Sequence, residues 1–142
     1  SSPGKTGTIN FYNLKTARLV DLPGYGYAKV SQSEKLRWAE LVEGYLNARR
    51  NVKLVIQIVD MRHSPTIDDL HMIDFLLNSD FNFLVAATKS DKLNKTERIK
   101  QLEVLDETFS EVDDMKLIPF SAVNGEGVEE IKNMIITQCD NQ

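Results

Sequence analysis

Short apolar runs alternate along this chain with longer segments in which hydrophobic residues recur every three or four positions. The runs at 53–60, 82–88 and 116–120 are rich in Val, Ile, Leu and Ala, which is typical of strands covered on both faces. Two earlier segments, 8–13 and 17–21, also predict strands.

Helices are expected between and after these strands. Three of them should begin with a capping box, in which Ser, Thr or Asn precedes an acidic residue by three positions. These pairs, with the expected helix ends, are Ser31 and Glu34 (Asn47), Thr66 and Asp69 (Leu77), and Asn94 and Glu97 (about Ser110). A fourth helix follows Gly127, with Val128, Ile131, Met134 and Ile135 along one face. Alternating strands and helices predict an α/β fold, with a mostly parallel sheet between helical layers.

Composition adds limits to this picture. The length of 142 residues, with 42% hydrophobic and 27% charged residues, suits a single soluble domain over residues 1–142. No apolar run approaches the roughly 20 residues that span a bilayer, and no secretory leader opens the chain. The lone cysteine, Cys139, excludes an internal disulfide, and the net charge of −4 gives no general footprint for nucleic acid.

The most informative residues are Thr88, Lys89, Ser90 and Asp91, directly after the apolar run that ends at Ala87. An ionised Asp accepts at both oxygens and so matches the ring N–H and the exocyclic amine of guanine. Adenine lacks that pair of donors. The Lys stem can lie along the base while its ammonium stays in water. A plain polar loop after a strand is the competing interpretation.

Asp21, Leu22, Pro23 and Gly24 end the strand expected at 17–21. An Asp in this position suits a Mg²⁺ site, and Gly24 allows the backbone to approach a terminal phosphate. An ordinary Pro-Gly turn explains the same residues equally well.

The third strand end carries Phe120, Ser121 and Ala122, where a backbone N–H of a small residue would meet the guanine carbonyl oxygen. Ser-Ala is a common pair, so it has weight only in this order along the chain.

Near the N-terminus, the segment Gly4, Lys5, Thr6, Gly7 and Thr8 looks like the end of a phosphate-binding P-loop. The motif requires an earlier glycine and a following helix, and neither fits here. We interpret the segment as a switch loop in which Thr6 closes on magnesium and the terminal phosphate.

Together these motifs resemble the EngB (YihA or YsxC) GTPases, bacterial members of the Era-like branch of P-loop GTPases. The segments that carry the resemblance are Pro3-Gly4-Lys5-Thr6, Asn10-Phe11-Tyr12, Val20-Asp21-Leu22-Pro23-Gly24-Tyr25-Gly26-Tyr27-Ala28, Val59-Asp60-Met61-Arg62-His63 and Thr88-Lys89-Ser90-Asp91. The string from Asp21 to Ala28 is highly specific, as is Thr88 where most GTPases have Asn.

The resemblance implies a three-layer G domain that binds GTP or GDP with Mg²⁺. It assigns magnesium to Thr6 and Asp21, the terminal phosphate to Gly4–Thr8 and Asp21–Gly24, and the guanine base to Thr88–Asp91 and Phe120–Ala122. It further implies a cytoplasmic monomer that takes part in large ribosomal subunit assembly and in cell division and septation.

Family members open with a strand, a P-loop and a helix that these 142 residues do not include. We therefore expect this chain by itself to bind GTP weakly or not at all and not to hydrolyse it. A non-catalytic docking module or an inactive GTPase remnant is the alternative function. A domain for another ligand, such as a flavin, would not explain the Lys-x-Asp loop.

Overall fold

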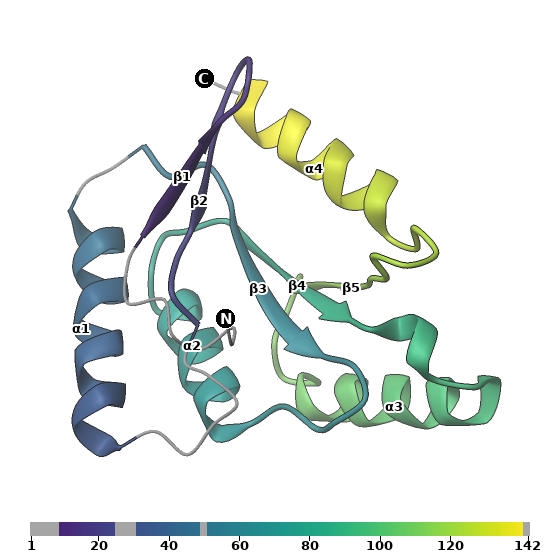
Figure 1. Cartoon of the computed structure of the whole chain (residues 1–142). Helices are drawn as coiled ribbons and strands as arrows, with labels where there is room; N and C mark the ends of the chain where they lie inside the picture. Colours follow the sequence, from purple (N-terminus) through teal and green to yellow (C-terminus); the bar gives the residue numbers. More distant parts are fainter. Residues whose placement is uncertain (1–8, 25–30, 49–50, 141–142) are drawn as a thin grey trace. The chain divides into compact units, whose positions relative to one another are not determined.

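The computed structural model describes residues 9–24, 31–48 and 51–140 and divides the chain into two compact units, 1–52 and 53–142. Figure 1 shows the elements in chain order. The strands are β1 (Asn10–Asn13), β2 (Arg18–Asp21), β3 (Val55–Asp60), β4 (Phe83–Thr88) and β5 (Lys116–Pro119). The helices are α1 (Gln32–Asn47), α2 (Ile67–Leu77), η1 (Ser90–Lys92), α3 (Lys95–Thr108) and α4 (Val128–Asp140). The predicted elements are thus confirmed, with ends that shift by at most two residues within the described ranges.

In the first unit, β1 and β2 form an antiparallel hairpin that pairs Asn10 with Asp21 and Asn13 with Arg18. The Arg18 guanidinium lies over the Phe11 ring, 5.6 Å from its centroid. Helix α1 begins at Ser31, whose hydroxyl accepts the Glu34 N–H over 3.2 Å. This bond is the Ser31 half of the predicted capping box.

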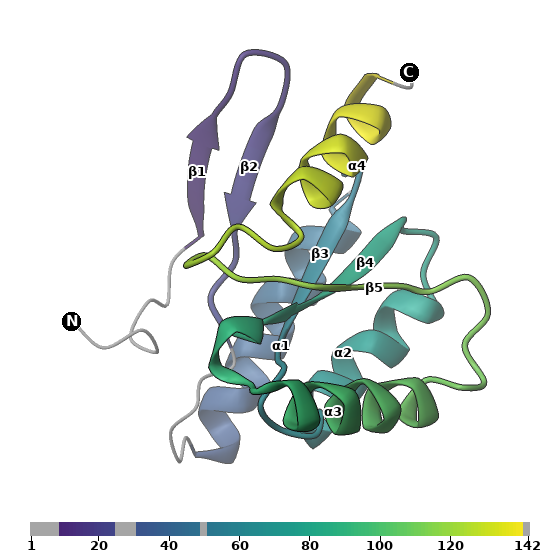
Figure 2. The same cartoon turned by 90° about the vertical axis from the view of Figure 1, so that its right-hand side faces the viewer.

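In the second unit, β3, β4 and β5 form a parallel sheet in the order β3-β4-β5. Helices α2 and α3 cover one face, and α4 covers the other (Figure 2). The first face buries Val59, Val85, Ile73 and Leu105, and the second buries Leu84, Ala86, Ile118 and Ile131. This arrangement is the predicted three-layer α/β architecture, and it explains why β4 is apolar from Phe83 to Ala87.

The helix starts of the second unit follow the sequence signals. At both α2 and α3 the N-cap side chain accepts a backbone N–H, and the acidic side chain three residues later accepts the N-cap N–H. The predicted apolar face of α4 is only partly buried. Ile131 is buried and Met134 and Ile135 are half-buried, whereas Val128 is 38% exposed in the first turn.

Candidate functional site

The loop after β4 makes a sharp turn. Lys89 adopts a left-handed conformation with φ of 62°, and Ser90–Lys92 follow as one 3-10 turn closed by the Lys92 N–H on the Lys89 carbonyl at 3.0 Å. The Thr88 hydroxyl donates to the Val59 carbonyl over 3.1 Å, which fastens the start of the loop to β3. This turn places Asp91 beside the end of β5 and leaves it half-buried.

Asp91 is held by Ser121. The Ser121 hydroxyl donates to Asp91 Oδ1 over 2.9 Å, and Ser121 is fully buried. The same oxygen accepts the N–H groups of Val123 and Asn124 at 3.1 Å each. Because these two N–H groups occupy its acceptor side, the hydroxyl proton is directed at the carboxylate. The sequence predicted a role for Ser121 only through the backbone, so this side-chain contact was missed.

Backbone hydrogen bonds extend the sheet beyond its strands. The Phe120 N–H donates to the Ala87 carbonyl at 2.8 Å, and the Ser90 N–H donates to the Phe120 carbonyl at 3.1 Å. The Ser121 N–H is used by the fold itself, since it donates to the Glu126 carbonyl at 3.0 Å. Within this loop, exposed Ala122 is therefore the better candidate for a backbone donor to a base.

A charged cluster lies behind the two loops. Glu126 Oε1 accepts from the Ser90 hydroxyl at 2.7 Å and from Arg98 Nη1 at 2.8 Å, and Glu126 Oε2 pairs with Arg98 Nη2. The bond from Arg98, with a further contribution from Ser90, lowers the pKa of Glu126, while the same pair raises the pKa of Arg98. No sequence motif pointed to Glu126 or Arg98.

A second charged group lies at the end of β3. Arg62 binds Asp60 through Nε at 3.0 Å and Nη2 at 2.8 Å, and the Arg62 backbone N–H adds a bond of 3.0 Å. These bonds close a local turn between Asp60 and Arg62. Hydrogen bonding from Arg62 is the main reason that the pKa of Asp60 falls from 3.8 to about 2. The Lys89 ammonium also lies 3.6 Å from Asp60 Oδ2.

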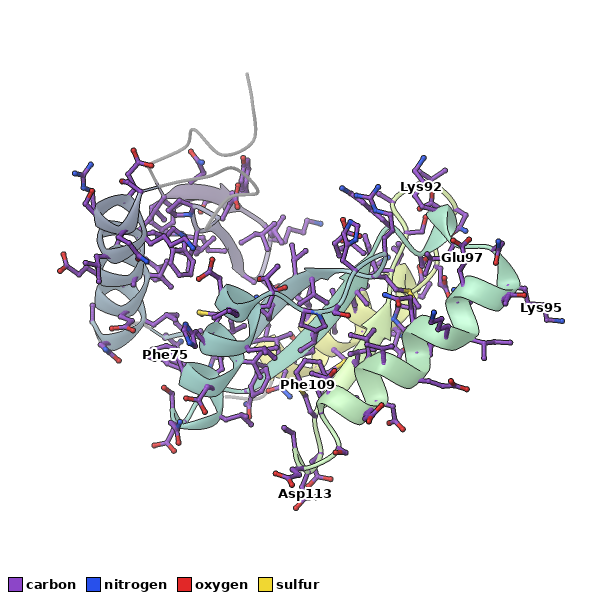
Figure 3. The ribbon with its side chains drawn as sticks, turned by 90° about the horizontal axis from the view of Figure 1, so that it is seen from below. Phe75, Lys92, Lys95, Glu97, Phe109 and Asp113 are labelled. Carbon is purple, nitrogen blue, oxygen red and sulfur yellow. The ribbon has the colours of Figure 1, made fainter. Side chains whose placement is uncertain are left out.

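Charged side chains of both signs follow Asp91 along the chain. Figure 3 labels Lys92, Lys95 and Glu97 at the N-terminal end of α3, whereas Asp113 lies beyond its other end. The Lys92 ammonium lies 4.0 Å from Asp91 Oδ2 and is 60% exposed, so this contact is weak.

The first unit carries the other candidate motif. Asp21 ends β2 and is exposed, as is Gly24, while Pro23 is buried and its carbonyl accepts the indole N–H of Trp38. Leu22 is half-buried. Gly4–Thr8, including Thr6, lie outside the described residues. The structure therefore brings Thr88–Asp91 and Phe120–Ala122 together within the second unit and describes Asp21–Gly24 within the first.

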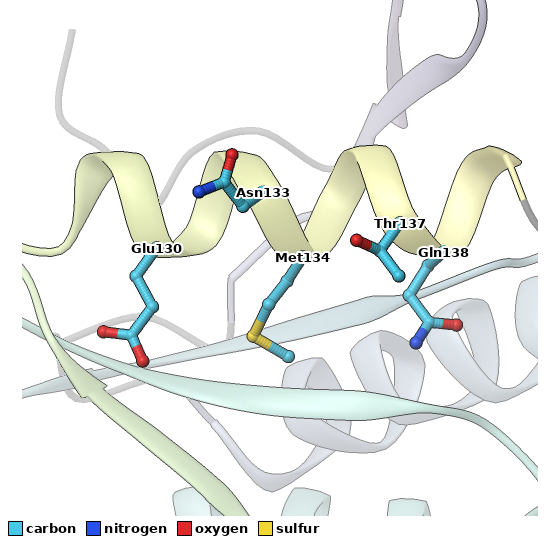
Figure 4. Close-up of a pocket in the computed structure, with 5 residues that line it drawn as sticks. All are labelled: Glu130, Asn133, Met134, Thr137 and Gln138. Carbon is cyan, nitrogen blue, oxygen red and sulfur yellow. The ribbon is translucent and has the colours of Figure 1, made fainter.

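A hollow of about 330 Å³ lies along α4, and none of the predicted site residues lines it (Figure 4). Its lining is Glu130, Asn133, Met134, Thr137 and Gln138.

Among the described residues no cluster of three or more His, Cys, Asp or Glu could hold a metal ion. Within the same ranges, no helix combines the length and the apolar character needed to cross a bilayer.

Comparison with known sequences identifies the family. The probable GTP-binding protein EngB of Syntrophomonas wolfei is 47% identical over 133 residues, which cover 93% of this chain and 68% of the relative. That of Finegoldia magna is 46% identical over 140 residues, covering 96% of this chain and 70% of the relative. This chain belongs to the EngB family of GTP-binding proteins.

Broader comparisons agree with EngB and its G-domain fold. Residues 3–135 match the family model FeoB_N, described as Ferrous iron transport protein B. A solved cytosolic domain of the FeoB iron transporter from T. maritima is only 23% identical, with a TM-score of 0.55, so the likeness to FeoB is one of fold.

Two further solved structures are similar. The crystal structure of a probable GTP-binding protein engB has a TM-score of 0.77 at 23% identity, covering 96% of this chain and 86% of its own. Elongation factor SelB from Methanococcus maripaludis, in complex with the GTP analogue GPPNHP, has a TM-score of 0.68 at 26% identity, covering 96% of this chain and 29% of its own.

Proposed function

We propose that this chain recognises the guanine base of GTP and GDP with the loops Thr88–Asp91 and Phe120–Ala122. The observation that carries the proposal is the bond of 2.9 Å from the buried Ser121 hydroxyl to Asp91. A carboxylate fixed in direction can accept two parallel donors at once, and guanine offers such a pair on its ring N–H and exocyclic amine. The relatives named as GTP-binding proteins support the same ligand.

Each residue of the two loops has a distinct part in this scheme. Asp91 accepts from the base, the Ala122 N–H donates to the guanine carbonyl oxygen, and the stem of Lys89 lies along the ring. Thr88, Ser90, Phe120 and Ser121 act on the ligand indirectly, because their contacts hold the loops in place.

Asp21 and Thr6 would hold Mg²⁺, with Gly4–Thr8 and Asp21–Gly24 near the phosphates. The exposed carboxylate of Asp21 fits this ion, since Mg²⁺ prefers hard oxygen ligands and is usually held by one or two carboxylates together with phosphates and water. When bound, the ion supplies neutralisation of charge on the β- and γ-phosphate oxygens.

For the whole protein we propose hydrolysis of GTP to GDP and phosphate, as a cytoplasmic monomer built on a single G domain, of which residues 1–142 are a copy incomplete at the N-terminus. Its proposed partner is the large ribosomal subunit, and its proposed cellular role is in subunit assembly, cell division and septation. These points rest on the EngB resemblance alone, since the chain spans 68–71% of the first three relatives' length.

Titration of fluorescent GDP and GTP, with ATP as the competitor, tests guanine recognition in this chain joined to the N-terminal strand, P-loop and helix of an EngB relative. We expect excess GDP, but not ATP, to displace the probe. The conservative variant Asp91→Asn should abolish the preference, and Asp106→Asn, an exposed Asp on α3, is the matched control. Equal displacement by ATP would contradict the proposal and favour the docking-module alternative.

A further inference from the structure

We propose that Glu126 is a positioning residue that fixes the spacing between Asp91 and the Ala122 backbone, and that this spacing sets the selectivity for guanine over related purines. The inference rests on the proposed function, because it concerns how the same two loops read the base. It assigns a role to Glu126 and Arg98, which lie outside the motifs, and to the Ser90 side chain that they hold.

Glu126 contacts both base-recognition loops with different parts of the same residue. Its carboxylate accepts the Ser90 hydroxyl at 2.7 Å, and Ser90 is the neighbour of Asp91. Its main-chain carbonyl accepts the Ser121 N–H at 3.0 Å, and Ser121 is the neighbour of Ala122. Glu126 therefore links Ser90, which precedes the proposed acceptor Asp91, to Ser121, which precedes the proposed donor Ala122.

Arg98 holds the Glu126 carboxylate in the direction that this contact requires. Its two terminal nitrogens bind the two carboxylate oxygens, and Arg98 is the fourth residue of α3. Such fork-to-fork pairing restricts rotation of the carboxylate more than a single bond would. A helix of the rigid scaffold is thereby connected to both loops.

The exposure of the pair indicates that this role is mainly geometric. The side chains of Arg98 and Glu126 are 32% and 33% exposed, so solvent screens their attraction and their effect on global stability should be small. Ser90 is buried, with 3% of its surface exposed, so its hydroxyl has little access to water as a substitute partner. Loss of Glu126 would leave that hydroxyl without its acceptor and let the loop of Asp91 shift.

Inosine diphosphate, IDP, provides a readout that a purely structural role would not change. Inosine lacks the exocyclic amine and so makes one of the two bonds to Asp91 that guanine makes. With Asp91 correctly placed, the protein binds GDP more tightly than IDP. Displacement of Asp91 reduces this difference in affinity. A general loss of folded protein would reduce the apparent affinities for GDP and IDP equally and leave their ratio unchanged.

The experiment measures the affinities for GDP and IDP in this chain joined to the N-terminal strand, P-loop and helix of an EngB relative, in three variants of that protein and in one control variant. We expect Glu126→Ala to reduce the GDP-to-IDP affinity ratio about 10-fold, the effect of one charge-assisted hydrogen bond. Arg98→Ala should reduce it less, and the double variant should lose no more than Glu126→Ala. Glu129→Ala, an exposed neighbour on α4, is the matched control.

An unchanged ratio in Glu126→Ala, or additive losses in the double variant, would overturn the inference. Amide hydrogen exchange of residues 90–93 and 121–126, measured without nucleotide, tests independently whether Glu126 holds the two loops in place. Exchange should accelerate in both loops in Glu126→Ala, and protection equal to the parent in both loops would also overturn it. If the unsubstituted protein shows no preference for GDP over ATP, the proposed function itself fails, and this result is distinct from the others.

Discussion

Asp60 and Lys89 face each other across the ends of two neighbouring strands, with 3.6 Å between Asp60 Oδ2 and the Lys89 ammonium. The parallel register of β3 and β4 places Asp60 opposite Thr88, so the left-handed turn at Lys89 brings its side chain back over β3. Arg62 binds the same carboxylate with two nitrogens. The Asp60 carboxylate thus attracts two cations, Lys89 of the base-recognition loop and Arg62 two residues along the chain.

The first prediction concerns acid stability. The folded-state pKa of Asp60 is about 2, below its ordinary 3.8. Its stabilising contribution is therefore complete above pH 3.8 and is lost as the pH falls toward 2. Asp60→Asn should cost about 1 kcal/mol of unfolding free energy at pH 6, after allowance for screening at exposed Arg62. The difference from the parent should shrink between pH 4 and pH 2 in urea titrations. Asp80→Asn, an exposed Asp after α2, is the control, and a constant difference at all pH values would exclude this assignment.

The second prediction concerns Ser121. Its hydroxyl serves Asp91 and the backbone N–H groups of Val123 and Asn124, so Ser121→Ala removes three contacts in a buried site. We expect about 10-fold weaker binding of GDP, measured by fluorescence titration, because Asp91 loses the bond that fixes its direction. The same substitution made in an Asp91→Asn background should cause little further loss. Ser110→Ala, at an exposed position after α3, should bind GDP as the parent does. Full retention of GDP affinity in Ser121→Ala would contradict the role of this contact.

The third prediction compares two glycines of the loop before α4. Both have positive φ, 83° at Gly125 and 80° at Gly127. A Cβ at Gly127 would lie 2.3 Å from the Pro119 carbonyl oxygen, whereas a Cβ at Gly125 would meet nothing within 4 Å. We expect Gly127→Ala to cost about 3 kcal/mol and Gly125→Ala about 1 kcal/mol in urea unfolding. Equal costs would mean that backbone strain alone, without the close approach to β5, governs this loop.

The sequence predicted the elements of this fold well because their signals are local. The N-caps at Thr66 and Asn94 act over three residues, and the apolar runs of β3 and β4 reflect burial on both faces. The sequence also indicated that the loops of Asp91 and Ser121 lie close together, because neighbouring parallel strands bring their carboxyl ends to one edge of the sheet.

The side-chain network around the site could not be predicted in the same way. Ser90 and Glu126 are 36 positions apart, and Arg98 and Glu126 are 28 apart, so no periodic pattern connects them. Nothing in the sequence indicated that Lys89 would turn back across β3 to lie beside Asp60. Long-range pairs of this kind depend on the strand register and on single rotamers. The arrangement of Gly4–Thr8, predicted as a switch loop, remains a prediction.

The most direct test of guanine recognition by Asp91 is the affinity of Asp91→Asn for GDP and for xanthosine diphosphate, XDP. It should be made in this chain and in this chain joined to the N-terminal strand, P-loop and helix of an EngB relative. Xanthine carries a carbonyl where guanine has its amine, so an Asn amide donor should restore the lost contact. We predict that the joined protein binds GDP, that Asp91→Asn exchanges this preference for XDP, and that this chain by itself binds weakly. If Asp91→Asn still prefers GDP, then Asp91 does not read the base and the assignment of the site is wrong.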